Sequence, residues 1–210
     1  MEEDIYKETF GTWDKMAELY EQKFMPIQIY NDSYDVFCKV LNKEDAAIFE
    51  IGCGPGNIAK YVIKQLPHCN FFGTDVAPSM VELARKNNPT ATFEVMDCRL
   101  LHELEQKYDG IIAGFCLPYL SPTDTKKLVS DCKSLLNNKG MLYVSFVAGA
   151  VIESGYKTNS YGDRVYFNYH EKETLKNLLM QNGFEEPLEL NVPYHGDEVH
   201  TIFITRKQSN

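Results

Sequence analysis

The sequence predicts an α/β fold with a doubly wound, mostly parallel sheet in a single domain of 210 residues. Strand-like apolar runs alternate with helix-like runs, which is typical of a parallel sheet covered by helices on both faces. With 44% hydrophobic residues, the chain can bury one sizeable core. No linker, repeat or low-complexity tract divides it. We therefore expect one domain over residues 1–210, with a helical cap over 1–45 and an α/β core over 46–206.

The cap is predicted from helical spacing ahead of the core. Apolar residues recur on one face of Thr9–Phe24 at Phe10, Trp13, Met16, Ala17, Leu19, Tyr20 and Phe24. Such a stripe is typical of ordinary packing as well as of a lid. A second helix over about 31–41 would complete the cap.

The first core strand ends in a glycine-rich turn that predicts a ligand-binding loop. Ile48–Ile51 is followed by Gly52, Gly54 and Gly56, and then by a helix-compatible stretch over 58–66. Glycines at this junction allow the backbone to approach a ligand closely. A dinucleotide fingerprint, G-x-G-x-x-G, fits poorly because Asn57 takes the place of the late glycine. The turn could also be structural punctuation without a ligand.

The second strand, over 70–74, ends on Asp75. An acidic side chain about 20 residues beyond the loop can accept hydrogen bonds from both hydroxyl groups of a ribose. Parallel strands of one βαβ unit end at the same edge of the sheet, so Asp75 should lie beside the loop. Alternatively, Asp75 caps the predicted helix Pro78–Asn87.

Two more strands repeat the pattern. The run 91–96 closes on Asp97 and Cys98, and Asp97 could also cap a short helix over 99–106. The fourth strand, over 109–114, leads into Phe115–Leu120. A helix over 123–136 then stops at 137–140, and a fifth strand follows over 141–147.

The irregular stretch 148–169 is expected to cover the substrate. It carries Tyr156, Tyr161, Tyr166 and Tyr169 and leaves the fifth strand at the ligand edge of the sheet. A loop of this length in a compact domain is usually functional or mobile. A surface hairpin with aromatic packing is the alternative.

His170 opens a predicted helix over 171–182 that starts at the ligand rim, so it is a candidate general base. A half-exposed histidine at a helix N-terminus is the simpler interpretation. The chain closes with strands over 184–192 and 199–206. If the first of these is parallel to the sheet, their turn places Tyr194 and His195 near the same rim.

Glu50 with its three alternating glycines resembles the first motif of the class I S-adenosylmethionine-dependent methyltransferases, and the similarity covers about residues 48–205. The glycines leave room for an amino-acid moiety, and Glu50 is placed to accept a hydrogen bond from its ammonium group. The resemblance implies a Rossmann-like sheet of order 3-2-1-4-5-7-6 with an antiparallel, inserted last strand, and S-adenosyl-L-methionine as the cofactor.

The resemblance also implies roles for individual residues. Asp97 would face the adenine amino group, residues 115–120 would line the methyl-bearing end, and Tyr20 would border the active site from the cap. Tyr20 and His170 are thus the candidate catalytic residues. The candidate cofactor-binding residues are Glu50, Gly52, Gly54, Gly56, Asp75, Val76, Met80, Asp97, Cys98 and Phe115.

The implied reaction is an in-line displacement at the sulfonium methyl carbon, which depends mainly on proximity and alignment in a dry pocket. A base is needed only if the acceptor must lose a proton. We expect a small-molecule methyltransferase. The alternatives are an aminopropyltransferase or a protein methyltransferase on the same scaffold, or a protein that binds S-adenosylmethionine or S-adenosylhomocysteine without chemistry. A plain NAD-binding domain ranks below these because of Asn57.

Composition disfavours several other classes. A net charge of -9 argues against nucleic acid as a partner. Leu117-Pro118-Tyr119 departs from the D/N-P-P-Y/F motif of methyltransferases that act on base amines. Six cysteines without a C-x-x-C pair suggest free thiols and no metal site. The acidic start has no signal-peptide pattern, and no apolar run approaches 18 residues, so we expect a cytoplasmic protein that does not associate with membranes.

Overall fold

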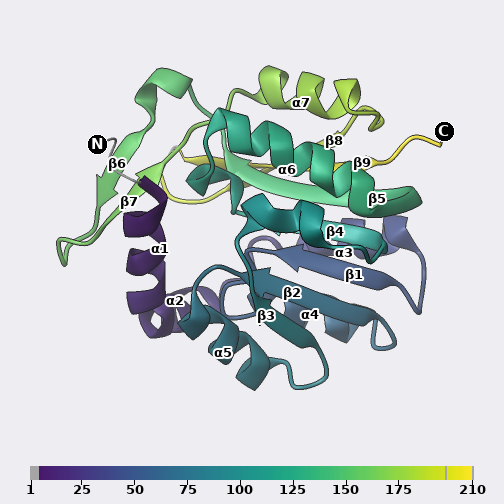
Figure 1. Cartoon of the computed structure of the whole chain (residues 1–210), viewed down its shortest axis with the longest axis horizontal. Helices are drawn as coiled ribbons and strands as arrows, with labels where there is room; N and C mark the ends of the chain where they lie inside the picture. Colours follow the sequence, from purple (N-terminus) through teal and green to yellow (C-terminus); the bar gives the residue numbers. More distant parts are fainter. Residues whose placement is uncertain (1–4, 197, 210) are drawn as a thin grey trace.

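A seven-stranded sheet forms the centre of the computed structural model, which describes residues 5–196 and 198–209 (Figure 1). Its strand order is β3-β2-β1-β4-β5-β9-β8, with β9 antiparallel to both neighbours. Numbered within this sheet alone, the order is 3-2-1-4-5-7-6, so the expected topology is confirmed. The strands are β1 (Ala47–Ile51), β2 (Asn70–Asp75), β3 (Thr92–Val95), β4 (Tyr108–Gly114), β5 (Leu136–Val147), β8 (Leu188–Pro193) and β9 (Val199–Arg206).

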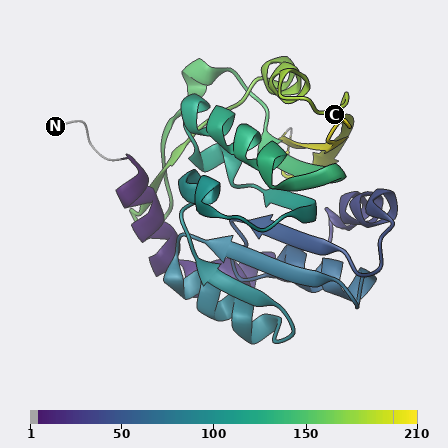
Figure 2. The same ribbon diagram turned by 45° about the vertical axis from the view of Figure 1, so that its right-hand side comes forward.

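Helices cover both faces of this sheet (Figures 1 and 2). One layer holds α3 (Asn31–Leu41), α4 (Asn57–Gln65) and α5 (Pro78–Asn87), and the other holds the 3₁₀-helix η1 (Cys98–Glu103), α6 (Pro122–Leu135) and α7 (Lys172–Gln181). Alternate residues of β1 point to opposite helix layers. Ile48 packs under α3, α4 and α5, whereas Phe49 packs under η1, α6 and α7, and both are 0% exposed. Burial on both faces explains why the central strands are continuous apolar runs.

The N-terminal segment forms two helices, α1 (Ile5–Lys15) and α2 (Ala17–Phe24), instead of the single helix that was expected. Met16 separates them with φ -93° and ψ 4°. The pair is attached to α5: the Ser79 amide donates to Asp14 Oδ1 at 2.8 Å. The Asn87 side-chain amide donates to Glu21 Oε1 at 2.7 Å. The cap is therefore held over the carboxyl ends of the strands, where α1 and α2 appear in purple in Figure 1.

Most of α3 lies in a helix layer of the sheet, although Tyr34 near its start lines a cavity described below. Phe37 of α3 is fully buried and packs edge-on against Tyr143 of β5, with ring centroids 6.1 Å apart. The helix has an apolar face that matches the sheet, so it lies in the first helix layer beside α4.

The stretch 148–169 folds into the 3₁₀-helix η3 (Val151–Glu153) and a hairpin of β6 (Gly155–Thr158) and β7 (Arg164–Phe167). The hairpin packs against α1. Thr12 Oγ1 donates to the Arg164 carbonyl at 2.8 Å, and the Tyr166 amide donates to Thr9 Oγ1 at 3.0 Å. The cap and the hairpin thus form one continuous roof, and the irregular loop is corrected to a hairpin.

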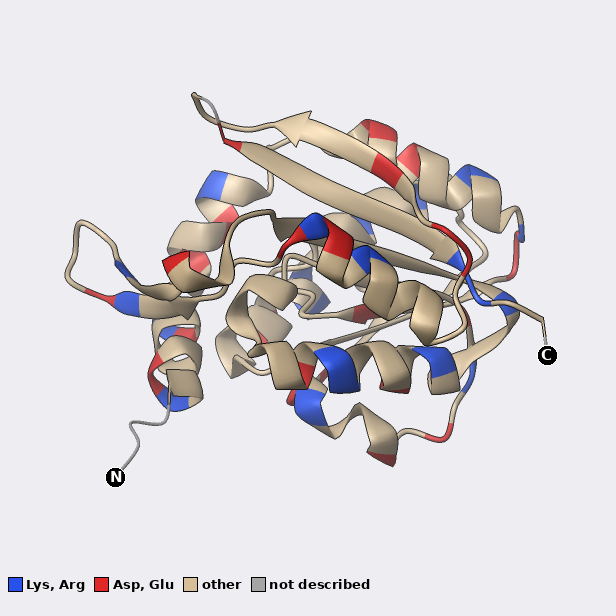
Figure 3. Ribbon diagram, turned by 90° about the horizontal axis from the view of Figure 1, so that it is seen from above, with Lys and Arg blue, Asp and Glu red and all other residues tan. Residues whose placement is uncertain are grey.

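The surface carries charged residues of both signs. Lysine and arginine residues are interspersed with aspartate and glutamate on the helices seen in Figure 3. Within residues 5–196 and 198–209, no helix has the length and apolar character needed to cross a membrane.

The strand β5 begins at Leu136, earlier than expected, because Tyr108 pairs with Leu136 ahead of a register shift.

Candidate functional site

The glycine-rich turn between β1 and α4 is a left-handed backbone segment. Gly52 has φ +68° and Gly54 has φ +51°, a conformation that disfavours other residues. A Cβ atom on Gly52 would lie 3.0 Å from the Cβ of Cys116. The turn therefore needs glycine for its conformation and, at Gly52, for close contact with the next loop.

Gly56 has a different role from the one expected. Its φ is +82°, and a Cβ atom there would lie 2.3 Å from Nδ2 of Asn88 and 3.2 Å from Cα of Ala84. In the described part of the chain it lines neither cavity discussed below. Gly56 thus allows the turn to pack on the end of α5, and the structure places it away from both cavities.

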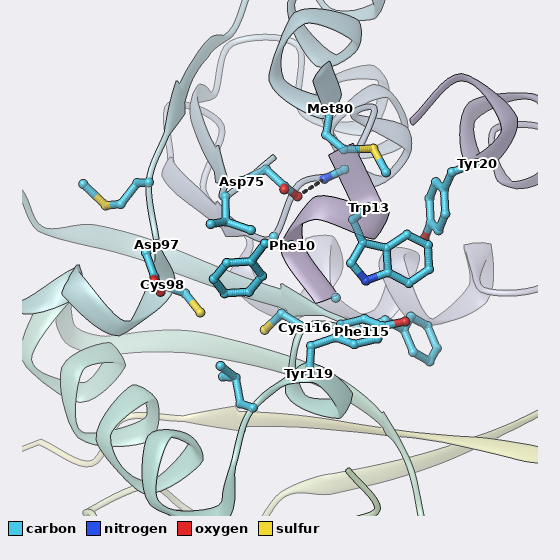
Figure 4. A pocket seen from close by; sticks show the side chains of 16 residues that line it. Phe10, Trp13, Tyr20, Asp75, Met80, Asp97, Cys98, Phe115, Cys116 and Tyr119 are labelled. Carbon is cyan, nitrogen blue, oxygen red and sulfur yellow. Dashed lines mark hydrogen bonds between the residues drawn. The ribbon is translucent and has the colours of Figure 1, made fainter. Parts of the chain in front are cut away.

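A cavity of about 110 Å³, called here the first cavity, lies between the glycine turn, the ends of β2 to β4, and α1 and α2. Figure 4 shows Met80, Tyr20 and Trp13 on one side of it and Cys116, Phe115 and Tyr119 on the other. Most of the expected site residues meet here: Tyr20, Gly52, Gly54, Asp75, Val76, Met80, Asp97, Cys98 and Phe115. The other lining residues are Phe10, Trp13, Met96, Gly114, Cys116, Tyr119 and Leu120.

Asp75 lies between the glycine turn and the loop before α5. Its Oδ2 accepts a hydrogen bond from the Gly54 amide, and its Oδ1 accepts one from the Ala77 amide, each at 2.9 Å. Burial raises the pKa of this carboxyl group, and these backbone hydrogen bonds partly oppose the rise. The side chain thus orders both loops around the cavity. Each oxygen retains a lone pair for a further donor.

Asp97 combines a capping role with its position in the cavity. Its Oδ1 accepts a hydrogen bond from the Arg99 amide at 2.9 Å, so it caps η1 as the alternative interpretation expected. Its Oδ2 also accepts a 2.6 Å bond from the Arg99 guanidinium. That guanidinium lies 4.1 Å from the centroid of the Tyr6 ring. The cap therefore reaches Asp97 through Arg99.

A second cavity, of about 240 Å³, adjoins the first and shares Trp13, Tyr20, Phe115 and the glycine turn with it. Its walls come from the cap, the start of α3, the hairpin and the β8–β9 turn. Its described lining residues include no lysine or arginine. The lining residues that the second cavity does not share with the first are Phe24, Ile27, Tyr30, Tyr34, Glu50, Cys53, Asn57, Ile58, Pro118, Val147, Phe167, Tyr194, Glu198 and His200.

Glu50 is the most unusual side chain of the second cavity. It is 0% exposed, and neither of its oxygens has a hydrogen-bond partner among the described residues. Burial, and then the charge of Asp75, raise the pKa of Glu50 well above its usual value. The nearby Ala59 amide opposes the rise, although its geometry does not amount to a regular hydrogen bond. A buried, unpartnered carboxylate is costly, so a cationic ligand placed beside it would be bound favourably.

Three aromatic side chains, Trp13, Tyr20 and Tyr119, line both cavities. The Trp13 ring lies edge-on to Tyr20 and Tyr119, with centroids 5.5 and 5.2 Å away. Its Nε1 is buried and has no hydrogen-bond partner among the described residues. Burial raises the pKa of Tyr20, as do the nearby carboxylates of Asp75 and Glu50. Tyr20 therefore borders the site as a neutral phenol, which suits a donor better than a base.

His170 does not line either cavity within the described chain. It is 7% exposed, with Nε2 2.9 Å from the Leu117 carbonyl and its ring edge-on to Phe146. Burial lowers its pKa. The residue pairs with Ala148 in an isolated bridge before α7 begins, which turns the imidazole toward the core. The structure thus supports a packing role for His170 in place of the expected general base.

Several cavity residues carried no local sequence signal. Tyr30, Phe167, Glu198 and His200 come from segments that only the fold brings together. Tyr194 was expected at the rim through the parallel orientation of β8, and it does line the second cavity. His195 does not appear among the described lining residues. The described residues hold no cluster of potential metal ligands.

A family model for a methyltransferase domain matches residues 48–140, from β1 into β5. The matched segment contains the glycine turn, Asp75 and Asp97. It covers β1 to β4 of the sheet described above and the start of β5. Residues 48–140 form a methyltransferase domain of the class I S-adenosylmethionine-dependent type.

Relatives in this methyltransferase family differ in their named acceptors. The chain is 23% identical over 141 residues to a demethylmenaquinone methyltransferase of Thermotoga maritima, covering 66% of this chain and 61% of that protein. It is 26% identical over 163 residues to a malonyl-[acyl-carrier protein] O-methyltransferase of Ilyobacter polytropus, covering 76% and 52%. It is also 26% identical over 216 residues to the tRNA N(3)-methylcytidine methyltransferase Mettl2 of Drosophila melanogaster, covering 86% and 64%. The matches thus span roughly half to two thirds of the relatives.

A solved methyltransferase has the same fold over nearly the whole chain. The 1,6-didemethyltoxoflavin-N1-methyltransferase of Burkholderia thailandensis superimposes with a TM-score of 0.73 at 17% identity. The superposition covers 97% of this chain and 88% of that chain. At this identity the likeness concerns the fold alone.

Proposed function

We propose that this chain binds S-adenosyl-L-methionine across the two cavities and transfers its methyl group to an uncharged small molecule. The observation that carries this proposal is Glu50, a fully buried carboxylate without a hydrogen-bond partner among the described residues, beside a turn of left-handed glycines. Together they provide a counter-ion for an ammonium group and space for the backbone-like part of an amino acid.

The described residues fit this cofactor at both ends. Glu50 would hold the amino-acid end, and the remaining lone pairs of Asp75 would accept hydrogen bonds from the ribose hydroxyls. Met80, Asp97 and Cys98 surround the far part of the first cavity, where the adenine would lie. When bound, the cofactor supplies a methyl carbon attached to a sulfonium, whose departure leaves a neutral thioether.

The protein's own contribution is alignment and exclusion of water. The Trp13, Tyr20 and Tyr119 rings pack together and line both cavities, so they would shield a bound ligand from solvent. Aromatic faces also stabilise a nearby positive charge, such as that of a sulfonium. Because the leaving group is already good, positioning two reactants in such an enclosure supplies much of the rate enhancement.

The walls of the second cavity support an uncharged acceptor of limited size. The roof formed by α1 and the β6–β7 hairpin closes over this region, and the described lining contains Glu50 and Glu198 but no lysine or arginine. A carboxylate or phosphate would therefore be repelled. This favours neutral aromatic compounds over malonyl groups or RNA, the acceptors that two of the relatives' names specify.

Calorimetric titration with S-adenosylmethionine, S-adenosylhomocysteine and NAD tests the binding half of the proposal. We expect dissociation constants of about 1–100 μM for the two sulfur nucleosides and no response to NAD. A folded protein that binds neither sulfur nucleoside would contradict the proposal. Incubation with methyl-tritiated cofactor then separates an enzyme from a pure binding protein, because only an enzyme shows methyl transfer or slow uncoupled turnover.

A further inference from the structure

Three hydrogen-bonded side chains connect the second cavity with the surface. The Tyr30 hydroxyl lies 2.7 Å from Nδ1 of His200, and Nε2 of His200 lies 2.8 Å from Oε1 of Glu198. Tyr30 and His200 are 8% and 6% exposed, whereas the Glu198 side chain is 46% exposed. All three line the second cavity. The row therefore runs from an enclosed phenol to a carboxylate in contact with water.

The chemistry of Glu198 fixes the direction of both hydrogen bonds. A carboxylate only accepts hydrogen bonds, so Nε2 of His200 carries the hydrogen that is donated to Glu198. In the neutral imidazole the other nitrogen, Nδ1, is then an acceptor. The Tyr30 hydroxyl must donate to it. The Tyr30 oxygen therefore has lone pairs left to accept a hydrogen bond from another molecule.

Packing holds the imidazole in this orientation. Tyr194 stacks on His200 with ring centroids 4.4 Å apart and an interplanar angle of 22°, and Phe115 meets it edge-on at 4.8 Å. Phe115 itself is held at φ +55°, with its amide donating to Ser145 Oγ at 2.9 Å. A non-glycine residue at positive φ is strained and must be held by its surroundings. The Phe115 ring, which lines both cavities, is thus fixed against His200.

Burial keeps Tyr30 in its neutral form. It raises the pKa of the phenol, with smaller contributions from Tyr194, Tyr20, Tyr143 and Glu198. Tyr30 is therefore unsuited to act as a standing phenolate. It can take up one proton at its oxygen while it passes its own proton to His200.

We propose that Tyr30, His200 and Glu198 form a proton relay that accepts the proton of a phenolic hydroxyl group while that oxygen is methylated. This deepens the proposed methyl transfer and rests on it. The aromatic walls favour a flat ring, the absence of lysine and arginine from the described lining favours an uncharged one, and the relay requires an acidic O–H. A phenol combines these properties.

The proposed step balances in atoms and charge. The acceptor oxygen forms a bond to the methyl carbon as the bond between that carbon and sulfur breaks, and the electron pair stays on sulfur. The acceptor proton moves to the Tyr30 oxygen, and the Tyr30 proton moves to Nδ1 of His200. The positive charge that leaves the sulfonium thus reappears on the imidazolium beside Glu198, from which the proton is released to water.

The test compares two phenols with the same variants. The probes are 4-methylphenol and 4-nitrophenol, assayed with methyl-tritiated cofactor at a pH where only 4-nitrophenol is largely ionised. Tyr30→Phe keeps the ring but removes the relay oxygen, and Glu198→Gln removes the terminal carboxylate. Tyr61→Phe is the control. It removes a hydroxyl of α4 that donates to Asp35 of α3 at 2.8 Å, and Tyr61 is not among the described lining residues of either cavity. Calorimetry with S-adenosylhomocysteine is run on every variant.

We expect Tyr30→Phe to lower turnover of 4-methylphenol about 100-fold or more and that of 4-nitrophenol by less than about threefold, because an ionised acceptor needs no base. Glu198→Gln should show the same selectivity with a smaller loss, and Tyr61→Phe should change neither rate. An equal loss with both phenols, or a wild-type protein that binds S-adenosylhomocysteine but methylates neither phenol, would overturn the relay. Lack of cofactor binding by the wild type would instead refute the proposed function.

Discussion

The first cavity is lined mainly by residues that directly follow consecutive strands, whereas the second is lined by residues from segments far apart in the chain. Asp75 is the last residue of β2 and Asp97 follows β3, and both strands are parallel strands of one βαβαβ run. Tyr30, Phe167 and His200 come from a helix start, a hairpin and an antiparallel strand. The first arrangement repeats a local rule of parallel sheets, and the second depends on how the whole chain packs.

This difference shows which half of the site can be recognised from a sequence motif. A cofactor of constant shape is bound by a strand–turn–helix unit with its own sequence signature. An acceptor is bound by whatever surfaces meet above it, and those surfaces carry no common spacing. We therefore expect substitutions in the first group to change cofactor affinity and substitutions in the second to change acceptor chemistry.

The largest effect is expected for Glu50→Gln. If Glu50 pairs with the cofactor ammonium, its loss should weaken S-adenosylmethionine binding by about 2–4 kcal/mol, because a buried charge pair loses one partner. Calorimetry measures this directly. Glu94→Gln, on the exposed edge strand β3, is the matched control and should leave the affinity unchanged. Equal affinity of Glu50→Gln and wild type would remove Glu50 from the cofactor site.

The same substitution should stabilise the free protein at neutral and alkaline pH. The pKa of Glu50 is raised in the folded state above the usual value of 4.5. Above pH 4.5 the unfolded chain therefore ionises this group first, and the free energy of unfolding falls as the pH rises toward the folded-state pKa. Glu50→Gln should remove this decline, which thermal unfolding of the free protein across pH would reveal. A wild-type pH profile identical to that of the variant would contradict this account.

A smaller effect on cofactor affinity is expected for Asp75→Ala. Loss of ribose hydrogen bonds and of the two bonds that order the loops should weaken binding by about 1–3 kcal/mol. Asp109→Ala is the control, because Asp109 also accepts a backbone bond, from Ala47 at 3.0 Å, but at the opposite edge of the sheet. Both variants should lose stability, yet only the first should lose affinity. Equal affinities in the two would exclude Asp75 from the ribose site.

The smallest effect on the site is expected for His170→Gln. Loss of the bond to the Leu117 carbonyl should lower the free energy of unfolding by about 1–2 kcal/mol and leave cofactor affinity unchanged. Because burial lowers the pKa of His170 below 6.5, wild-type stability should decline as the pH falls through 6.5. The variant should lack this contribution, as chemical denaturation at several pH values would show. Selective loss of turnover without loss of stability would restore the general-base role.

The residues and the helix that lie elsewhere than expected share a physical cause. Gly56 belongs to the correct motif, but its Cα lies against Asn88 and Ala84 of α5, a contact set by helix packing. His170 lies where a crossover helix starts, but the bridge to Ala148 turns its ring inward. For α3, the apolar face was recognisable, but the sequence did not specify whether that face covers the sheet or the cavity.

Local sequence patterns specify the mostly parallel sheet, its glycine turn and the acids at or after the ends of neighbouring strands. Those features depend on local periodicity and on strand ends that share one edge. Three other features are visible only in the folded chain: the unpartnered burial of Glu50, the roof made by α1 with the β6–β7 hairpin, and the Tyr30–His200–Glu198 row. Those features join residues separated by up to 170 positions, as in the bond between Tyr30 and His200, and they depend on packing that no local pattern specifies.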